Sequence, residues 1–487
     1  MATTTTPASA AAARYIGPAT IRGAAPTRSG DLTARLWRED LTREHGFEPL
    51  EIEGTVPPEL AGTLFRNGPG LFGHGAARYQ HPFEADGAVT AVRLGGGQVL
   101  GASRVTPTAG LVEERAAGKV LYGFSAPWWR RMRNMLGGRD KNPANTSVMI
   151  WQDRLFALVE SSRPTELAQA DLALRGVSDL GGVVRGAFSA HPHRVAARRA
   201  TYNFGVVQGR KTELVMYELP DVGPARELGA VPLPGPTMLH DFIATDRHLV
   251  FFLSPVRIDV PKILLGLGTF ETLFQWKPAL GTEVIVVPID RPAEVVRFTT
   301  AAFYQWHFAN AFEREGEIVV DYVRYPSFDS FGEIGRALRG GSGEILTAGR
   351  YHRATIDLRA KSLRSEPRFD RGCEFATIAP GAEGREHGAT YMVLGDLAAV
   401  GKLDARTGVV VSHELPATQR TTEPLFVPRP GATGDDDGHV LALQHDGPTN
   451  RAFLAIYDAA RLPDGPVARA WFDHHVPITF HGTYARS

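Results

Sequence analysis

The sequence predicts an all-β fold, for which a β-propeller is the most economical arrangement. Apolar runs of strand length recur after Gly46, and turn residues bound most of them. The chain contains 52 glycines and 34 prolines, which fits the many turns that sheet proteins need. The runs are too numerous for one sandwich of two sheets and do not alternate with helical segments. A propeller accommodates them as small sheets repeated around one axis.

The expected strands are spread over the whole chain after residue 60. Residues 88–94 alternate apolar and polar side chains and end at three consecutive glycines. The sequence carries no WD or kelch signature, so no repeat motif supports the propeller independently. The remaining expected strands are residues 63–66, 155–159, 200–204, 214–219, 248–253, 283–288, 317–323, 389–394, 439–444 and 452–457.

Composition excludes several classes of function. The 487 residues include 53 Lys+Arg and 53 Asp+Glu, so no basic excess favours nucleic acid. No apolar run of 18 residues occurs, and one cysteine, Cys373, fits a reducing compartment. We therefore expect a cytoplasmic protein. Residues 1–30 begin with an Ala/Thr-rich stretch that lacks the pattern of a signal peptide. They are predicted to be a disordered tail before a single domain, residues 31–487.

Two segments depart from the strand pattern. Residues 127–136 are aromatic and basic and favour a helix. Residues 258–276 carry large apolar side chains with few charges, but the segment is too short to span a bilayer. The sequence leaves two interpretations open for it: a buried helix, or an apolar lip that dips into a membrane surface. The apolar residues of that lip are Ile263, Leu264, Leu267, Phe270 and Phe274.

Four of the sixteen histidines stand in segments that suggest a common metal site. His191, His240, His307 and His481 each lie next to at least one apolar residue and are separated by tens of residues or more. These separations match neither a zinc finger nor an H-E-x-x-H helix. Ligands so dispersed can converge only if each comes from a different structural unit, as the inner strands of a propeller allow. For any one of them alone, a core histidine with satisfied hydrogen bonds is the alternative.

The order and spacing of several short motifs carry a resemblance to a known family. The chain resembles the carotenoid cleavage oxygenases, which are non-haem iron enzymes that cleave carbon–carbon double bonds. The resemblance covers nearly the whole chain after the N-terminal tail. Its motifs are Phe65–Pro69, His81–Gly87, Asn145–Val148, Ala157–Glu160, Glu423–Pro428 and Phe480–Tyr484, together with the three internal histidine segments.

This resemblance implies a seven-bladed β-propeller with a helical and loop cap over its top face. It implies Fe(II) on the axis, held by the four histidines. Glu160, Glu374 and Glu423 would accept hydrogen bonds from His240, His307 and His481 respectively, which leaves His191 without a glutamate. Phe375, Ala376 and Thr377 depart from the commoner continuation after the second of these glutamates. Thr146 maps to a small residue that partly screens an open iron position.

The implied reaction is the cleavage of an alkene by O2 into two carbonyl compounds, with no reducing cofactor. Stilbenoid-cleaving relatives resemble one another in a lysine immediately before the first glutamate. Val159 stands there, so we expect a carotenoid or apocarotenoid. A stilbenoid or isoeugenol-type phenylpropenoid, a retinoid isomerase activity on the same scaffold, and a metal-free binding propeller remain as alternatives. His81, Asp86, His474 and His475 are expected to be structural.

Overall fold

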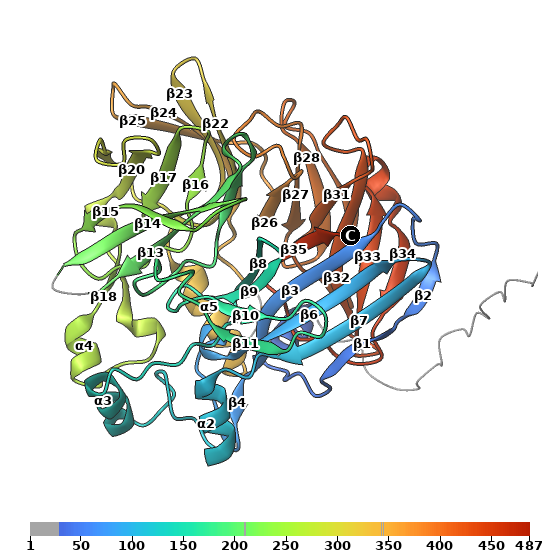
Figure 1. The fold of residues 1–487 in the computed structure, drawn as a ribbon, viewed down its shortest axis with the longest axis horizontal. Helices are drawn as coiled ribbons and strands as arrows, with labels where there is room; N and C mark the ends of the chain where they lie inside the picture. The colour runs from blue at the N-terminus through green and yellow to red at the C-terminus, as the bar shows by residue number, and fades with distance from the viewer. Residues whose placement is uncertain (1–28, 209–210, 342, 344) are drawn as a thin grey trace, which may run out of the picture.

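The protein is a seven-bladed β-propeller, as the resemblance implies (Figure 1). The computed structural model describes residues 29–487 except 209–210, 342 and 344. The predicted tail, residues 1–30, lies almost wholly outside the described residues. Seven antiparallel sheets form the blades, and two short hairpins lie outside them. Several expected strands, including residues 248–253 and 389–394, coincide with observed ones.

The first three blades come mainly from the N-terminal half of the chain. Blade one contains β1 (His45–Pro49), β7 (Gln98–Val105), β6 (Asp86–Gly95), β3 (Gly62–Leu71) and β35 (His481–Arg486). Blade two contains β11 (Leu174–Val177), β10 (Thr165–Leu167), β9 (Arg154–Leu158) and β8 (Ser147–Trp151). Blade three contains β12 (His193–Val195), β13 (Ala200–Val207), β14 (Thr212–Pro220) and β15 (Arg226–Leu233).

The other four blades follow in chain order. Blade four contains β16 (Ile243–Ala244), β17 (His248–Leu253), β20 (Thr282–Pro288) and β21 (Val296–Thr300). Blade five contains β22 (Tyr304–Arg314), β23 (Glu317–Tyr325), β24 (Arg350–Asp357) and β25 (Ser362–Pro367). Blade six contains β26 (Cys373–Ile378), β27 (Ala389–Leu394), β28 (Ala399–Asp404) and β29 (Val410–Glu414). Blade seven contains β2 (Glu51–Gly54), β34 (Pro466–Trp471), β33 (Arg451–Asp458), β32 (Gly438–Asp446), β30 (Gln419–Thr421) and β31 (Leu425–Pro428).

Segments from both ends of the chain close the ring. β35 pairs with β3 on the inner side of blade one, where Asn67 faces His481 across the strands. β2 pairs with β34 on the outer side of blade seven, and Figure 1 shows the blue β2 beside the red β34. The innermost strands contact one another around the axis, from β12 through β16, β22, β26, β31 and β35 to β8. Side chains on these strands can therefore meet at the centre.

Apolar clusters between adjacent blades hold the ring together. Between blades three and four, Phe204 and Leu214 pack with Leu249 and Phe251 in one cluster whose members are almost fully buried. The strands of such blades are covered on both faces, so their sequences read as continuous apolar runs rather than strict alternations. Burying a side chain of this size stabilises the fold by about 1.5–3 kcal/mol.

In the described part of the chain, five α-helices and connecting loops make up the cap and edges of the propeller. α2 (Ala109–Ala117), α3 (Trp128–Leu136) and α4 (Val260–Leu264) gather at one side, at the lower left of Figure 1. α1 (Ser29–Leu36) contacts α5 (Asp329–Leu338). α3 agrees with the predicted helix of residues 127–136. The short 3₁₀ helices are η1 (Pro82–Glu84), η2 (Ala196–Arg198), η3 (Glu271–Leu273), η4 (Pro278–Leu280) and η5 (Ala459–Asp464).

The segment 258–276 is not one buried helix. It contains α4, η3 and the strand β19 (Phe274–Trp276), which pairs with β18 (Val256–Ile258). Gly266 and Gly268 adopt positive φ angles of 67° and 81°, which interrupts any continuous helix after α4. The other hairpin outside the blades joins β4 (Gly73–His74) and β5 (Ala77–Arg78).

A buried charged cluster ties the first blade to α2. His74 Nε2 lies 3.0 Å from Asp86 Oδ2 and 3.3 Å from Glu114 Oε2, and Lys141 Nζ lies 2.7 Å from Asp86 Oδ1 and 2.5 Å from Glu114 Oε2. The lysine and a protonated histidine balance the two carboxylates. Because Lys141 already occupies the space between them, this cluster is a structural ion network rather than a metal site.

We expect this cluster to make stability fall at alkaline pH. Asp86 and Glu114 raise the pKa of His74 from 6.5 to about 9. A raised pKa means that the folded state binds the proton more tightly than the unfolded state. The stabilisation is therefore complete below pH 6.5 and is lost as pH rises through about 9. Thermal melts of the wild type and His74→Gln across this range check it: a wild-type melting temperature that falls no more than that of the variant would contradict the prediction.

Candidate metal centre

The four predicted histidines converge on the propeller axis from four different blades. His191 lies two residues before β12, His240 lies three residues before β16, and His307 and His481 lie in β22 and β35. In five of the six pairs that the four histidines form, the ring centroids lie 4.3–5.2 Å apart. His191, His240 and His307 each offer a nitrogen within 4.8 Å of the others. The structure thus brings together residues that lie up to 290 positions apart.

The three predicted glutamates come from the three blades that supply no histidine. Glu160 follows β9 in blade two, Glu374 lies in β26 of blade six, and Glu423 lies between β30 and β31 in blade seven. Their carboxylates lie 2.7 Å from His240 Nδ1, 2.5 Å from His307 Nδ1 and 2.8 Å from His481 Nδ1, respectively. His191 has no such close partner, because Glu160 Oε1 lies 3.9 Å from its Nε2. Each of the other three histidines therefore has a carboxylate within 2.8 Å of its Nδ1.

These contacts determine where the imidazole lone pairs point. A carboxylate facing Nδ1 accepts a hydrogen bond from the N–H there, which leaves Nε2 of the neutral imidazole as the nitrogen with the lone pair. The Nε2 atoms of His240 and His307 lie only 3.3 Å apart, so two lone pairs would face each other. His191 Nε2 is also buried without a hydrogen-bond partner among the described residues. Lone pairs that converge in this way fit a cation bound between them.

Burial and charge act together on the titration of the centre. Burial, followed by the neighbouring His240, His481 and His307, keeps the pKa of His191 well below its usual value. Its imidazole is therefore neutral, as a metal ligand must be. Burial alone would raise the pKa of Glu423, but His481 and Arg66 outweigh it and lower the pKa. The carboxylate is thus held in its charged form.

Arg66 and Tyr325 support two of the glutamates, and the sequence did not assign them a role. Arg66 is almost fully buried, and its Nη1 donates to Glu423 Oε2 at 2.6 Å. Tyr325 donates to Glu374 Oε1 at 2.9 Å. Arg66 belongs to the Phe65–Pro69 motif and to the expected strand 63–66. A charged residue in such a strand is rarely buried without a partner, and this feature of the sequence could have pointed to its role.

Thr146 lies at the centre, whereas the histidines predicted to be structural lie elsewhere. Thr146 Oγ1 donates to Asn145 Oδ1 at 3.1 Å and lies 3.4 Å from Glu160 Oε2. His81 lies between η1 and α5, where its Nε2 is 3.1 Å from the carbonyl oxygen of Phe331. His474 and His475 point to separate partners: the His474 ring contacts His45, and the His475 ring contacts His445.

Three cavities contact the histidine cluster. One, of about 530 Å³, is lined by His191, His307 and His481 on the side of β31 and β35, and the other two are largely apolar. The α5-side cavity, of about 350 Å³, is lined by Thr146, His240, His307, His481 and residues of α1 and α5. The α4-side cavity, of about 490 Å³, is lined by Val159, Glu160, His240 and the rings of Phe270 and Phe274. Phe83 and His240 line both cavities. An elongated apolar ligand could therefore lie with one part in each cavity and its middle beside the histidines.

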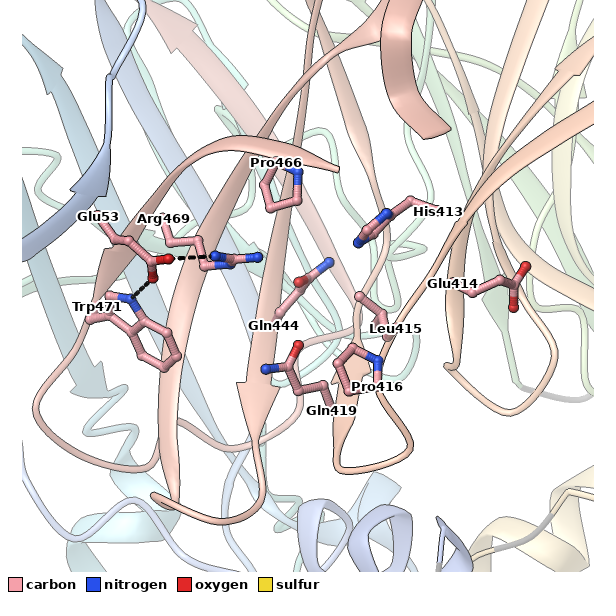
Figure 2. A pocket seen from close by; sticks show the side chains of 10 residues that line it. All are labelled: Glu53, His413, Glu414, Leu415, Pro416, Gln419, Gln444, Pro466, Arg469 and Trp471. Carbon is pink, nitrogen blue, oxygen red and sulfur yellow. Dashed lines mark hydrogen bonds and ion pairs between the residues drawn. The ribbon is translucent and has the colours of Figure 1, made fainter. Parts of the chain in front are cut away.

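A further cavity, of about 540 Å³, opens between blades six and seven, away from the histidine cluster (Figure 2). Its charged groups have partners: Arg469 Nη1 lies 2.7 Å from Glu53 Oε1, Trp471 Nε1 donates to Glu53 Oε2 at 3.3 Å, and Glu414 pairs with Arg371 outside the cavity. Its lining contains one histidine, His413. We therefore place the chemistry at the histidine cluster.

Comparison with known proteins agrees with this fold. The family model described as retinal pigment epithelial membrane protein (RPE65) matches residues 39–486. Apocarotenoid-15,15'-oxygenase of Synechocystis is 33% identical over 92% of this chain and 96% of that protein. Lignostilbene-alpha,beta-dioxygenase isozyme III of Sphingomonas paucimobilis is 26% identical over 90% of this chain and 93% of that protein.

Solved structures give the same result. The crystal structure of cobalt-substituted Synechocystis apocarotenoid oxygenase superposes with a TM-score of 0.86 at 30% identity, covering 95% of this chain and all of that one. That relative therefore holds a metal ion. The resemblance read from the sequence motifs is confirmed: the chain belongs to the RPE65 family of carotenoid cleavage oxygenases.

Proposed function

We propose that the protein is an Fe(II)-dependent dioxygenase that cleaves a carbon–carbon double bond of a carotenoid or apocarotenoid with O2. The observation that carries this proposal is the convergence of four histidines, three of them buried and His481 partly buried, beside two largely apolar cavities. His191, His240, His307 and His481 would hold the ion. The names of the relatives support the substrate class.

The residues of the centre form a charged site that is bordered by the largely apolar walls of two cavities. Three glutamates fix the histidine tautomers and supply negative charge that four neutral ligands lack. Bound Fe(II) supplies the redox chemistry that dioxygen requires. The alkene itself provides four electrons, so one double bond and one O2 become two carbonyl groups without a reductant. The apolar walls hold the polyene and keep water away from the reacting bond.

Val159 favours a polyene over a phenolic alkene. It lines the α4-side cavity beside Glu160 and cannot donate a hydrogen bond to a phenolic oxygen. The similarity to a lignostilbene dioxygenase keeps a stilbenoid or phenylpropenoid as the second candidate. Aerobic incubation of iron-loaded protein with carotenoids, apocarotenals, stilbenes and phenylpropenes tests both. We expect two carbonyl products from a polyene, whose masses sum to substrate plus O2. Turnover without oxygen uptake would overturn the proposal.

We also propose that α3 and the loop after α4 attach the enzyme to a membrane surface. Leu264, Leu265 and Leu267 are 49%, 65% and 56% exposed. Trp129 and Leu136 of the adjoining α3 are 58% and 83% exposed. The two segments are in contact, because Arg131 Nη2 donates to the carbonyl oxygen of Gly266 at 3.1 Å. No helix among the described residues could cross a bilayer, so the attachment would be peripheral.

The five residues predicted for this lip divide into two groups. Leu264 and Leu267 project into solvent, and Ile263 is half-buried beside them. The rings of Phe270 and Phe274 pack against Phe331 and line the α4-side cavity. The exposed leucines thus lie next to the cavity wall in sequence, and an apolar substrate could pass from lipid to cavity along them.

We expect replacement of Leu264, Leu265 and Leu267 by serine to reduce liposome binding and slow turnover of membrane-dissolved carotenoid. Each side chain that leaves lipid forfeits about 1.5–3 kcal/mol. Because the three side chains are exposed, the melting temperature should stay near that of the wild type. Serine at Val177, Val222 and Val409, exposed residues in other blades, is the matched control. Flotation equal to that of the control would refute a membrane role.

A further inference from the structure

The cavity of about 530 Å³ that contacts three of the histidines lies on the propeller axis. The inner strands of six blades line its wall, and Asp241, just before β16, represents the fourth blade. We call it the axial cavity. The residues that directly precede His240, His307 and His481 line the α4-side or α5-side cavity, whereas the residues that directly follow them line the axial cavity. It therefore reaches the histidines from the side opposite to the two apolar cavities.

The wall of the axial cavity is more polar than the walls of the other two. Asp241 and Glu383 bring carboxylates to it. Arg194 and Arg486, which are exposed to solvent, also line it, so the cavity extends from the histidines to the surface of the protein. A hydrated dication loses less solvation energy beside such polar groups than against apolar walls.

Glu383 gives the axial cavity a carboxylate that no neighbouring cation balances. Asp241 pairs with His193, whereas Glu383 accepts a hydrogen bond from the backbone N–H of Gly381 at 2.6 Å. Among the described residues, no basic side chain forms an ion pair with Glu383, and Arg194 is engaged in another ion pair. Burial raises the pKa of Glu383, and its hydrogen bonds and the nearby Arg194 and His193 do not reverse the shift. This partly buried carboxylate would gain from a passing cation.

We propose that the metal ion reaches the four histidines through the axial cavity, and that Glu383 lowers the barrier to its passage. The inference rests on the proposed function, because it takes the histidines as the metal ligands. Substrate and metal would then approach the histidines from opposite sides, the alkene through apolar walls and the ion through polar ones. Glu383 is not a proposed ligand. A group that stabilises the ion only in transit speeds uptake and release by the same factor and leaves the affinity unchanged.

Glu383→Gln tests the inference, because it removes the charge and keeps an acceptor oxygen. The measurements are the rate of Co(II) uptake by the metal-free full-length protein and the rate of Co(II) release from loaded protein to a chelator. We expect both rates to fall about ten-fold, the low end of the range for a charged cleft, with the same dissociation constant for Co(II). Added salt should shrink the difference from the wild type, since it screens the charge of Glu383 at the partly exposed wall.

Glu386→Gln is the matched control. Glu386 lies three residues further along the same loop, is exposed, and has its carboxylate 3.7 Å from Arg314 Nη1. It does not belong to the wall of the axial cavity, so we expect wild-type rates. Glu383→Lys and Glu386→Lys form a second pair: reversal of the charge should slow Co(II) exchange further at position 383 and leave it unchanged at position 386.

Two outcomes would overturn the inference. One is Co(II) exchange in the position-383 variants that equals exchange in the wild type or in the matched controls. The other is weaker Co(II) affinity with faster release, which would mean that Glu383 acts on the bound ion rather than on its passage. Failure of the proposed function is distinguishable: the wild type would then cleave no alkene while the exchange rates still differ between the position-383 variants and their controls.

Discussion

His240→Ala should abolish metal binding and alkene cleavage while leaving a folded protein. His240 is one of four converging histidines and has Nε2 3.3 Å from that of His307. Loss of a hydrogen-bonding partner of a ligand typically costs 10–100-fold in metal affinity or activity, and loss of a ligand itself should cost more. Because the lone pairs of the cluster repel in the absence of a cation, removing one imidazole should cost little stability. Metal analysis and thermal melting of the purified variant measure the two effects.

His445→Ala is the appropriate control for that variant. His445 is also buried, at 4% exposure, and its ring contacts His475 rather than the centre. We expect it to lower the melting temperature but to retain a full complement of metal. If His240→Ala keeps stoichiometric metal and wild-type turnover, the ligand assignment fails.

Glu423→Gln should slow turnover by about 10–100-fold and also destabilise the fold. The carboxylate of Glu423 has two partners: Oε1 lies 2.8 Å from His481 Nδ1, and Oε2 accepts a hydrogen bond from Arg66 Nη1 at 2.6 Å. An amide retains an acceptor oxygen but leaves the charge of Arg66 uncompensated inside the protein. Removing one partner of a buried ion pair typically costs about 3–5 kcal/mol.

Glu374→Gln separates the two effects. Its carboxylate faces His307 and Tyr325 but no arginine. We therefore expect the same slowing of turnover with a much smaller drop in melting temperature. Equal melting temperatures for the two variants would show that the stability of the fold does not depend on the charge pair between Arg66 and Glu423. Wild-type kinetics in Glu423→Gln would show that this glutamate has no role at the centre.

The long strands and the histidines were predictable because their signals are local. An apolar run such as residues 389–394 is bounded by turn residues, and its burial on both faces leaves a continuous apolar pattern. The histidine segments were recognisable by their motifs. The division of the site into four blades that give histidines and three that give glutamates follows from register around a ring, which no local pattern encodes.

The missed features depend on contacts between distant segments. Arg66 and Glu423 are 357 positions apart, and their pairing becomes visible only when β3 lies beside the loop before β31. The segment 258–276 was ambiguous because its apolar content fits several structures, and two glycines with positive φ end α4 early.

The position of His481 on the closing strand has a consequence for biosynthesis. β35 leaves the ribosome after three of the histidines and after Glu160, Glu374 and Glu423. Without β35, the inner edge of blade one has no partner at β3. A nascent chain that has folded blades two to six therefore holds at most three of the proposed ligands around an open ring. Under the proposed ligand assignment, the full set of four histidines therefore forms only when β35 pairs with β3 and closes the ring.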